Sequence, residues 1–356
     1  MRDIPSAKNL ALPALIVVSI FISQLMRAKE AIPTWRYEGQ IMGTTFSVKV
    51  RHPTEVKLEL ISDALEAVND RMSTYQPSSE LSLINKLKAK EVMTLSSPLR
   101  EVLNAARQVY QQSEGAFDIA VGPLVNAWGF GPNKERQMPS ALEIEHLKTL
   151  IGADSWTLND QGVSRSSKDV YLDLSAIAKG YAVDRVALAL DQAKVNNYWV
   201  EVGGEIRVKG LNGEGHFWRV GIERPAGKGK RRIFKIIDLN DQSLATSGDY
   251  RNRYVDSTGV TRSHTIDPTT GEPVTHTLAS VSVLHEDCMY ADAWATALNV
   301  LGAKRGLELA NTHKVAALFI TREGITNESQ DLDGAKTQYV AIESEEMTRY
   351  LKEIKP

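Results

Sequence analysis

The interleaving of strand-like and helix-like patterns along residues 31–356 constrains the fold most strongly. Residues 45–50 alternate between polar and apolar side chains with a period of two, which predicts a half-buried strand. Ile61, Leu65 and Val68 recur with the helical period instead and mark one face of a helix. Both kinds of segment continue to the C-terminus, so the chain is expected to combine sheets with helices.

Hairpin spacing favours one arrangement of these elements. Segments 198–202 and 205–208 flank Gly203-Gly204, as the two strands of a hairpin do. Hairpins join antiparallel strands, whereas a doubly wound sheet needs a helix between successive parallel strands. An α+β (mixed α/β) fold with mixed sheets is therefore expected. The other expected elements are strands at 169–174, 218–222, 233–239 and 278–284, and helices at 98–113, 175–190 and 289–301, the last closed by Gly302.

Composition excludes several classes of protein. A hydrophobic share of 42% among 356 residues can build a core, so a disordered chain is excluded. The 42 basic and 44 acidic side chains give a net charge of −2, which makes a nucleic-acid scaffold an unsuitable interpretation. The single cysteine, Cys288, excludes an intramolecular disulfide, a cysteine-based zinc site and an iron–sulfur cluster, and we expect it to be a small buried residue.

Residues 1–30 have the pattern of an export signal or a membrane anchor. The stretch from Leu10 to Met26 contains 17 residues without a charge, with Arg2 and Lys8 before it and Arg27 after it. No cysteine follows this stretch, so a lipoprotein anchor is excluded. We therefore expect residues 1–30 to be a signal peptide or an N-terminal membrane anchor, and the folded part to lie outside the cytoplasm.

Several familiar catalytic motifs are absent from the sequence. There is no His-Glu-x-x-His zinc motif and no Gly-x-Ser-x-Gly nucleophile elbow. Residues 221–228 approach a phosphate-binding loop, but the spacing is one residue too long and Gly229 replaces the required serine or threonine. The basic residues within 227–232 are more typical of a solvated hairpin tip.

Polar residues near the expected start of a helix could bind an anion. Asp173 ends an expected strand, Ser175 is a candidate N-cap, and Lys179 lies in the first turns that follow. Helix N–H groups with a nearby lysine suit a phosphate. An ordinary capped helix with a surface lysine gives the same pattern.

Asp292 and Thr296 are four residues apart, so one helix face presents both oxygens, as a hard cation such as Mg²⁺ requires. A helix-dipole aspartate and a threonine bonded to its own helix give the same spacing.

His264 precedes an Asp-Pro-x-x-Gly turn and could act as a general base, although a packing histidine is more common. Glycines beside aromatic residues at 115–118 and 128–132 suit a flat ring against the backbone, or turns with core aromatics.

Taken together, these segments resemble the ApbE family of FAD:protein FMN transferases. The resemblance covers nearly all of the chain after the N-terminal segment, and it is specific as a combination. The family folds as an α+β unit related to the T-fold, which agrees with the pattern above. The segments that carry it are 42–44, 72–75, 115–118, 172–181, 202–204, 263–268, 287–289 and the helix with Asp292 and Thr296.

The resemblance implies roles for particular residues. Mg²⁺ would be bound by Asp292, Thr296 and the backbone carbonyl of Ala176, and His264 would be the acid–base residue. The reaction would transfer FMN from FAD to a threonine hydroxyl of a target flavoprotein and release AMP. The FAD site would be lined by Met42, Tyr75, Ala116, Phe117, Asp118, Asp173, Lys179 and Ile266.

Two other functions remain open on the same residues. One is a metal-dependent FAD pyrophosphatase, in which water replaces threonine, and the other is a flavin-binding protein without turnover. The expected partners are flavin subunits of membrane-bound or exported redox complexes. Many family members are lipoproteins that carry a lipid on a cysteine near the N-terminus. This sequence lacks that cysteine, so it departs from the family in its mode of membrane anchoring. The expected location is the periplasmic side of the inner membrane, or the periplasm if residues 1–30 are cleaved.

Overall fold

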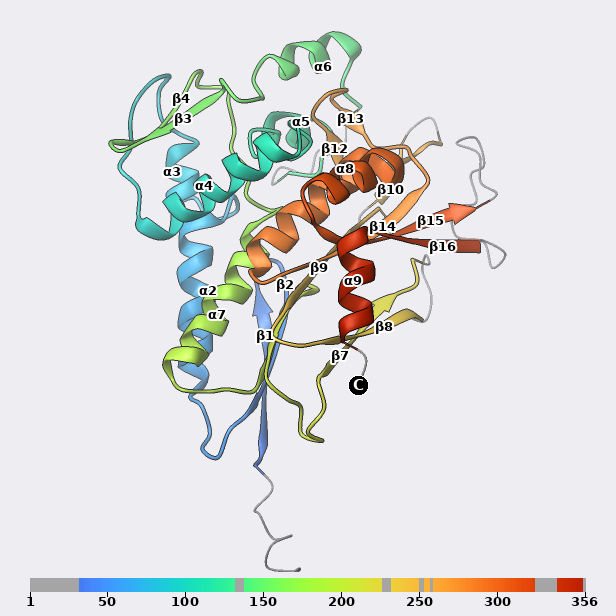
Figure 1. The fold of residues 1–356 in the computed structure, drawn as a ribbon. Coiled ribbons are helices and arrows are strands. Elements are labelled where there is room, and N and C mark those ends of the chain that lie inside the picture. Colours follow the sequence, from blue (N-terminus) through green and yellow to red (C-terminus); the bar gives the residue numbers. More distant parts are fainter. Residues whose placement is uncertain are drawn as a thin grey trace, which may run out of the picture.

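The computed structural model describes residues 32–131, 138–225, 232–249, 253–256, 259–323 and 338–354 (Figure 1). The predicted export or anchor segment at 1–30 and the basic loop at 227–231 lie outside these residues. Among the helices of the described ranges, none has both the length and the apolar character needed to cross a membrane. In chain order the elements are β1 (Thr34–Ile41), β2 (Thr44–Arg51), α2 (Leu58–Met72), α3 (Glu80–Ile84), α4 (Ser97–Gln112), α5 (Gly122–Ala127), α6 (Ala141–Lys148), β3 (Trp156–Asn159), β4 (Gly162–Arg165), α7 (Ala178–Gln192), β5 (Tyr198–Val202), β6 (Glu205–Lys209), β7 (Trp218–Glu223), β8 (Ile233–Leu239), β9 (Ser243–Gly248), β10 (Arg253–Val255), β11 (Thr261–Ser263), β12 (Ile266–Asp267), β13 (Glu272–Pro273), β14 (Leu278–His285), α8 (Cys288–Thr312), β15 (Ala316–Glu323), β16 (Gln338–Glu343) and α9 (Glu345–Glu353).

An eight-stranded sheet is the centre of the molecule, with the strand order β1-β2-β5-β6-β9-β14-β15-β16. This sheet and the helices around it confirm the predicted α+β fold, but the sheet is not mixed in strand direction as expected. Neighbouring strands in this sheet all pair antiparallel. Parallel direction occurs only at an isolated bridge between Val121 and Tyr171 in the described residues. Hairpin connections such as β5–β6 explain this, because they reverse the chain direction between neighbours.

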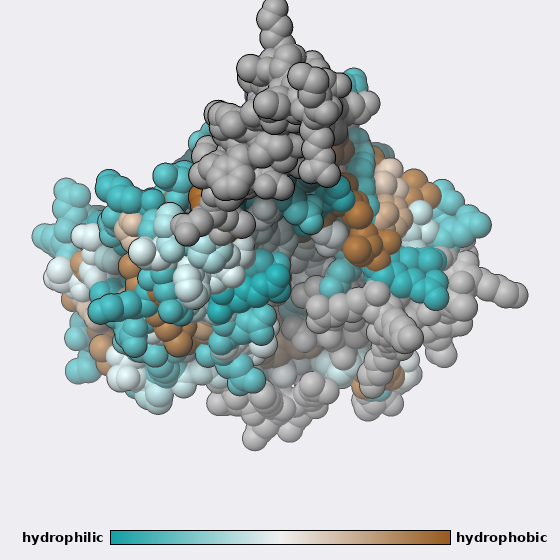
Figure 2. All heavy atoms as spheres, turned by 90° about the horizontal axis from the view of Figure 1, so that it is seen from below, coloured by the Kyte–Doolittle hydropathy of each residue, from teal (hydrophilic) through white to brown (hydrophobic). Residues whose placement is uncertain are grey.

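The sheet is covered on both faces. On β14, Val281 and Val283 belong to the large core that includes residues of α2, α4, α7 and α8, whereas Leu284 belongs to a second core with β7, β8 and α9. β14 is therefore buried along nearly its whole length, with only His285 half-buried. Figure 1 shows α8 lying across one face of the sheet and α9 beside β15 and β16. Among the coloured residues of the face drawn in Figure 2, hydrophilic side chains surround smaller hydrophobic areas.

The expected strand at 169–174 is wrong. Only Tyr171 forms a bridge there, and the chain then turns, because Asp173 Oδ1 accepts the N–H of Ser175 at 2.8 Å. The following helix, α7, begins at Ala178 instead of Ser175. Its N-cap residue is Ile177, which makes no side-chain capping bond, so Ser175 is not the cap that the sequence predicted.

The helix expected at 289–301 is confirmed and is longer than predicted. The chain leaves helical geometry at Gly302, where φ is 72°, as the predicted glycine stop requires. A second helical stretch then continues to Thr312. Cys288 begins α8 and is completely buried, in agreement with its predicted structural role.

Candidate active site

A pocket of about 320 Å³, lined by both polar and apolar residues, lies where the start of α7 and the first half of α8 meet the start of β6 and the end of β9. All the predicted site residues except Met42 and Tyr75 lie in its wall. Residues far apart in the sequence therefore meet in one place. The wall consists of Ala116, Phe117, Asp118, Ile119, Val121, Val125, Asp173, Ser175, Ala176, Lys179, Gly203, Glu205, Thr246, Ser247, Gly248, His264, Thr265, Ile266, Pro268, Asp292, Thr296 and Val300.

Lys179 lies between two buried carboxylates of this wall. Its Nζ is 3.2 Å from Glu205 Oε1 and 3.5 Å from Asp292 Oδ2. Burial acts to lower the pKa of Lys179, but Asp292 and Glu205 more than offset it, so the pKa is raised. Burial also raises the pKa of Glu205 to about 7, although Lys179 opposes the change. Lys179 is therefore charged, and two carboxylates already share that charge.

Asp292 also fixes the start of α7. Its Oδ2 accepts the N–H of Gly180 at 3.0 Å, so a side chain from α8 satisfies one of the free N–H groups of this helix start. A Cβ atom on Gly180 would lie only 2.3 Å from the carbonyl oxygen of Cys288, which shows how closely the two helices approach. The predicted Ser175 cap is thus wrong, because the helix starts later and Asp292 accepts the N–H of Gly180.

Thr296 lies one helical turn beyond Asp292, as predicted, and its Oγ1 is 3.2 Å from Ser247 Oγ. Ala176 lies in the same wall, and its backbone carbonyl, like these side chains, would be a hard oxygen donor. Mg²⁺ is usually held by one or two carboxylates and completes its shell with water and substrate phosphates. In the described ranges, no three His, Cys, Asp or Glu side chains form a metal-binding group. The donors therefore fit Mg²⁺ shared with a phosphate substrate, and not a metal held by side chains alone.

Glu205 and Gly180 are site residues that the sequence reasoning missed. Glu205 Oε2 is buried without a hydrogen-bond partner among the described residues, and its side chain is 6% exposed. Such a group is expensive to bury unless a ligand or ion completes its environment. The available signal was a carboxylate directly after Gly203-Gly204, which was interpreted only as the start of a hairpin strand.

Asp118 and Asp173 hold the opposite wall together. Asp118 accepts the N–H groups of Ala120 and Gly152, each at 2.8 Å, and its pKa is raised by burial despite these bonds. The N–H of Asp173 donates to Ile119 at 2.7 Å, and burial raises the pKa of its carboxyl. Asp173 thereby connects the segment that contains buried Ala116 and Phe117 to the turn before α7, and Asp118 connects that segment to Gly152.

His264 is half-buried in the pocket wall, with its ring centroid 6.4 Å from that of Phe130. The predicted Asp-Pro-x-x-Gly turn is confirmed, since Asp267 Oδ1 accepts the N–H of Thr269 at 2.8 Å. Trp128, in contrast, is 1% exposed and packs in a core cluster, so it offers no free face to a ring. The position of His264 suits an acid–base residue, but that role stays a prediction.

Met42 and Tyr75 are not among the residues that line the pocket of about 320 Å³. Met42 is in the turn between β1 and β2, with a positive φ of 51°. The nearby Thr44 is next to Gly203, because a Cβ on Gly203 would be 3.0 Å from the Thr44 methyl group. Tyr75 is exposed and lines a separate hollow of about 270 Å³ with Tyr171.

The fold and the pocket define an α+β protein whose pocket wall contains four carboxyl groups and one lysine. Residues 42–319 match the ApbE family, so the chain belongs to that family. A protein of Vibrio cholerae named FAD:protein FMN transferase is 41% identical over 290 residues, which cover 80% of this chain and 86% of the relative.

Solved structures agree with this assignment. The flavin transferase ApbE from Vibrio cholerae superposes with a TM-score of 0.77 at 37% identity, over 90% of this chain and 100% of that one. The apo form of the flavinyl transferase ApbE from Pseudomonas stutzeri gives a TM-score of 0.78 at 32% identity, over 90% and 97% of the two chains. The predicted family and fold are therefore confirmed.

Proposed function

We propose that this protein transfers FMN from FAD to a threonine hydroxyl of a target flavoprotein in a Mg²⁺-dependent reaction that releases AMP. Membership of the ApbE family supports the transfer reaction. The observation that carries the proposal is the cluster of Lys179, Glu205 and Asp292, with Thr296 on the same face of α8.

The charge of the pocket supports the metal requirement. The described wall contains four carboxyl groups, from Asp118, Asp173, Glu205 and Asp292, but only one lysine. Lys179 is already paired with two of these groups, so it cannot by itself neutralise a diphosphate. An anionic substrate would be repelled at contact distance in a pocket of this kind. A divalent cation held by these residues would supply the positive charge that offsets this repulsion.

In the proposed reaction, the threonine oxygen forms a bond to the phosphorus on the FMN side of FAD. The bond from this phosphorus to the bridging oxygen breaks, and AMP leaves with that oxygen. The hydroxyl proton passes to His264, which would contribute about 10²–10⁴-fold as a general base. Lys179 orients the diphosphate and keeps Asp292 and Glu205 in place. Asp292, Thr296 and the Ala176 carbonyl would hold Mg²⁺, which would stabilise charge on the transferred group.

The FAD molecule would extend along the pocket from the cluster of Lys179, Glu205 and Asp292. We assign to it the residues predicted from the sequence, and Tyr75 would reach it from the adjacent hollow. The proposed contacts are Met42, Tyr75, Ala116, Phe117, Asp118, Asp173, Lys179 and Ile266.

We further propose that residues 31–356 act as one catalytic unit on the periplasmic side of the inner membrane, with residues 1–30 as its signal or anchor. The uncharged stretch from Leu10 to Met26 supports this location. The acceptors would be flavin subunits of membrane-bound or exported redox complexes. Fractionation of cells that express the full chain tests the location, because a cytosolic fraction holding all of the protein would contradict it.

The function is tested by incubating the full chain with FAD, MgCl₂ and a candidate acceptor flavoprotein. The transferase predicts AMP in equal amount to the FMN attached to the acceptor, and no attachment after EDTA treatment. AMP and free FMN formed without any acceptor would favour the pyrophosphatase instead. Asp292→Ala distinguishes the transferase and the pyrophosphatase from a flavin-binding protein without turnover. If the protein is either enzyme, the rate of AMP release should fall at least 10²-fold in this variant. If it only binds flavin, the variant should keep its FAD affinity.

A further inference from the structure

The start of α8 is capped by a carboxylate from a different helix. Asp287 precedes α8, but its side chain makes no capping hydrogen bond. The N–H groups of Cys288 and Met289 donate instead to Asp184 of α7, at 3.0 Å to Oδ1 and 2.8 Å to Oδ2. One side chain thus satisfies two of the N–H groups that a helix start leaves without an intrahelical partner.

Asp184 is itself held from the sheet. Arg207 of β6 forms an ion pair with Asp184 Oδ1, and the same guanidinium lies 3.5 Å from Asp287 Oδ1. The side chain of Asp184 is only 14% exposed, and a buried carboxylate is tolerated only when its oxygens are paired in this way. A single side chain therefore connects α7, α8 and β6.

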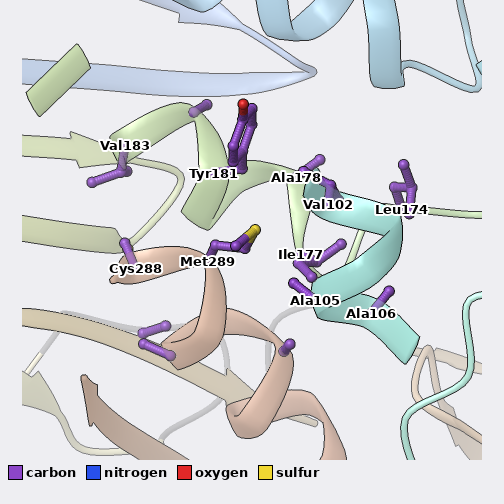
Figure 3. Packing of buried hydrophobic residues seen from close by; sticks show 14 of the residues in the cluster. Val102, Ala105, Ala106, Leu174, Ile177, Ala178, Tyr181, Val183, Cys288 and Met289 are labelled. Carbon is purple, nitrogen blue, oxygen red and sulfur yellow. The ribbon is translucent and has the colours of Figure 1, made fainter. Parts of the chain in front are cut away.

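A second link joins the same helices one turn further on. Gly180 precedes Asp184 by one turn of α7, and Asp292 follows Cys288 by one turn of α8. Asp292 accepts the N–H of Gly180 at 3.0 Å, so each helix supplies a carboxylate to the start of the other. Figure 3 shows the start of α8, with Cys288 and Met289, packed beside Tyr181 and Val183 of α7.

We propose that Asp184 is a positioning residue for the flavin transfer, an inference that rests on the proposed function. Asp184 is not among the residues that line the pocket, so it would act through Asp292 and Thr296. By fixing the start of α8 against α7, it holds Asp292 and Thr296 in the relation to Lys179 that the metal and the diphosphate require. Without it, the polar links that remain between the starts of α7 and α8 in the described residues are those of Asp292 with Gly180 and Lys179.

Asp184→Asn in the full chain tests this role. The amide keeps the size of the side chain, but it presents one acceptor and one donor group to two N–H donors. Loss of a residue that orients metal ligands typically lowers metal affinity by about 10–100-fold. We expect that loss in titrations with Mn²⁺ as the probe, followed by electron paramagnetic resonance with FAD present and without an acceptor protein. The Mg²⁺ concentration that gives half-maximal transfer should rise in parallel, and excess Mg²⁺ should restore most of kcat.

Asp191→Asn is the matched control. Asp191 also lies on α7 and pairs with β6, since Lys209 Nζ is 2.9 Å from its Oδ1, but this ion pair lies at the far end of both elements. The control should retain the Mn²⁺ affinity and the Mg²⁺ requirement of the parent protein. A purely structural role for Asp184 would lower the melting temperature without changing either metal readout.

Unchanged Mn²⁺ affinity in folded Asp184→Asn would overturn the proposal, as would an equal loss in Asp191→Asn. If Asp184→Asn does not fold, Asp184→Glu decides by the same two metal readouts, because it keeps the charge and displaces the carboxylate. A parent protein that binds Mn²⁺ but transfers no FMN would refute the proposed function instead. The Mn²⁺ comparison between the variants would still decide the role of Asp184.

Discussion

Gly180→Ala places one methyl group between the two helices that carry the proposed reaction centre. The added Cβ would lie 2.3 Å from the carbonyl oxygen of Cys288 and 2.9 Å from the Cβ of Asp292. Ordinary contact begins near 3.4 Å, so α7 and α8 must separate by about 1 Å. No side-chain rotation can relieve the contact with Cys288, because the oxygen belongs to the backbone of α8.

The expected magnitudes follow from this displacement. Overpacking costs about 1–3 kcal/mol, and alanine returns about 1 kcal/mol of helix preference, so the free energy of unfolding should fall by about 0–2 kcal/mol. The larger effect should be on activity, because the Gly180–Asp292 hydrogen bond and the Lys179–Asp292 contact both cross this gap. A 1 Å displacement of a catalytic group typically lowers the rate by about 10²-fold.

The assay is FMN transfer from FAD at saturating Mg²⁺, with urea unfolding of the same preparations. Gly213→Ala is the control, since its Cβ would meet only Thr34 Oγ1 at 3.6 Å. Near-parental activity of Gly180→Ala with unchanged stability would refute the inferred close contact of α7 and α8. A stability loss without an activity loss would refute its link to the reaction centre.

Three further predictions concern the charged groups of the pocket. Lys179→Met should lower the free energy of unfolding by about 2–3 kcal/mol in urea and abolish transfer, because Glu205 and Asp292 lose their shared cation. Burial raises the pKa of Glu205 to about 7, so between about pH 4.5 and 7 the folded metal-free protein keeps a proton that the unfolded chain releases. The free energy of unfolding should therefore fall as the pH rises through this range. Glu205→Gln should remove that part of the pH dependence in unfolding measured with EDTA. Asp118→Ala leaves the N–H groups of Ala120 and Gly152 without their acceptor, so calorimetry should show about 2–3 kcal/mol lower stability and weaker FAD binding, with Asp118→Asn intermediate.

The sequence predicted the local elements best where one periodic pattern was sufficient. The β5–β6 hairpin, the long strand β14 and the break at Gly302 all depend on neighbouring residues, and the structure confirms them. The prediction of where α7 starts was wrong because Asp292, which accepts the N–H of Gly180 there, is 112 residues away in the sequence. A local capping rule therefore selected Ser175, which was the nearest suitable side chain.

The site shows the same division between local and long-range information. Asp292 and Thr296 are one turn apart on one helix, so their common face was visible in the sequence. The resemblance to the ApbE family supplied most of the other wall residues. Glu205 and Asp184 were missed because their importance comes from contacts with Lys179 and the start of α8, which exist only after the chain has folded.

The most direct test of the proposed flavin transfer is mass spectrometry of a flavoprotein acceptor incubated with the full chain, FAD and Mg²⁺. The proposal predicts that one threonine-containing peptide gains the mass of FMN, that Thr296→Ala strongly reduces the gain, and that AMP appears in equal amount. An acceptor of unchanged mass, while FAD is cleaved to free FMN and AMP or stays bound and intact, would contradict the proposal.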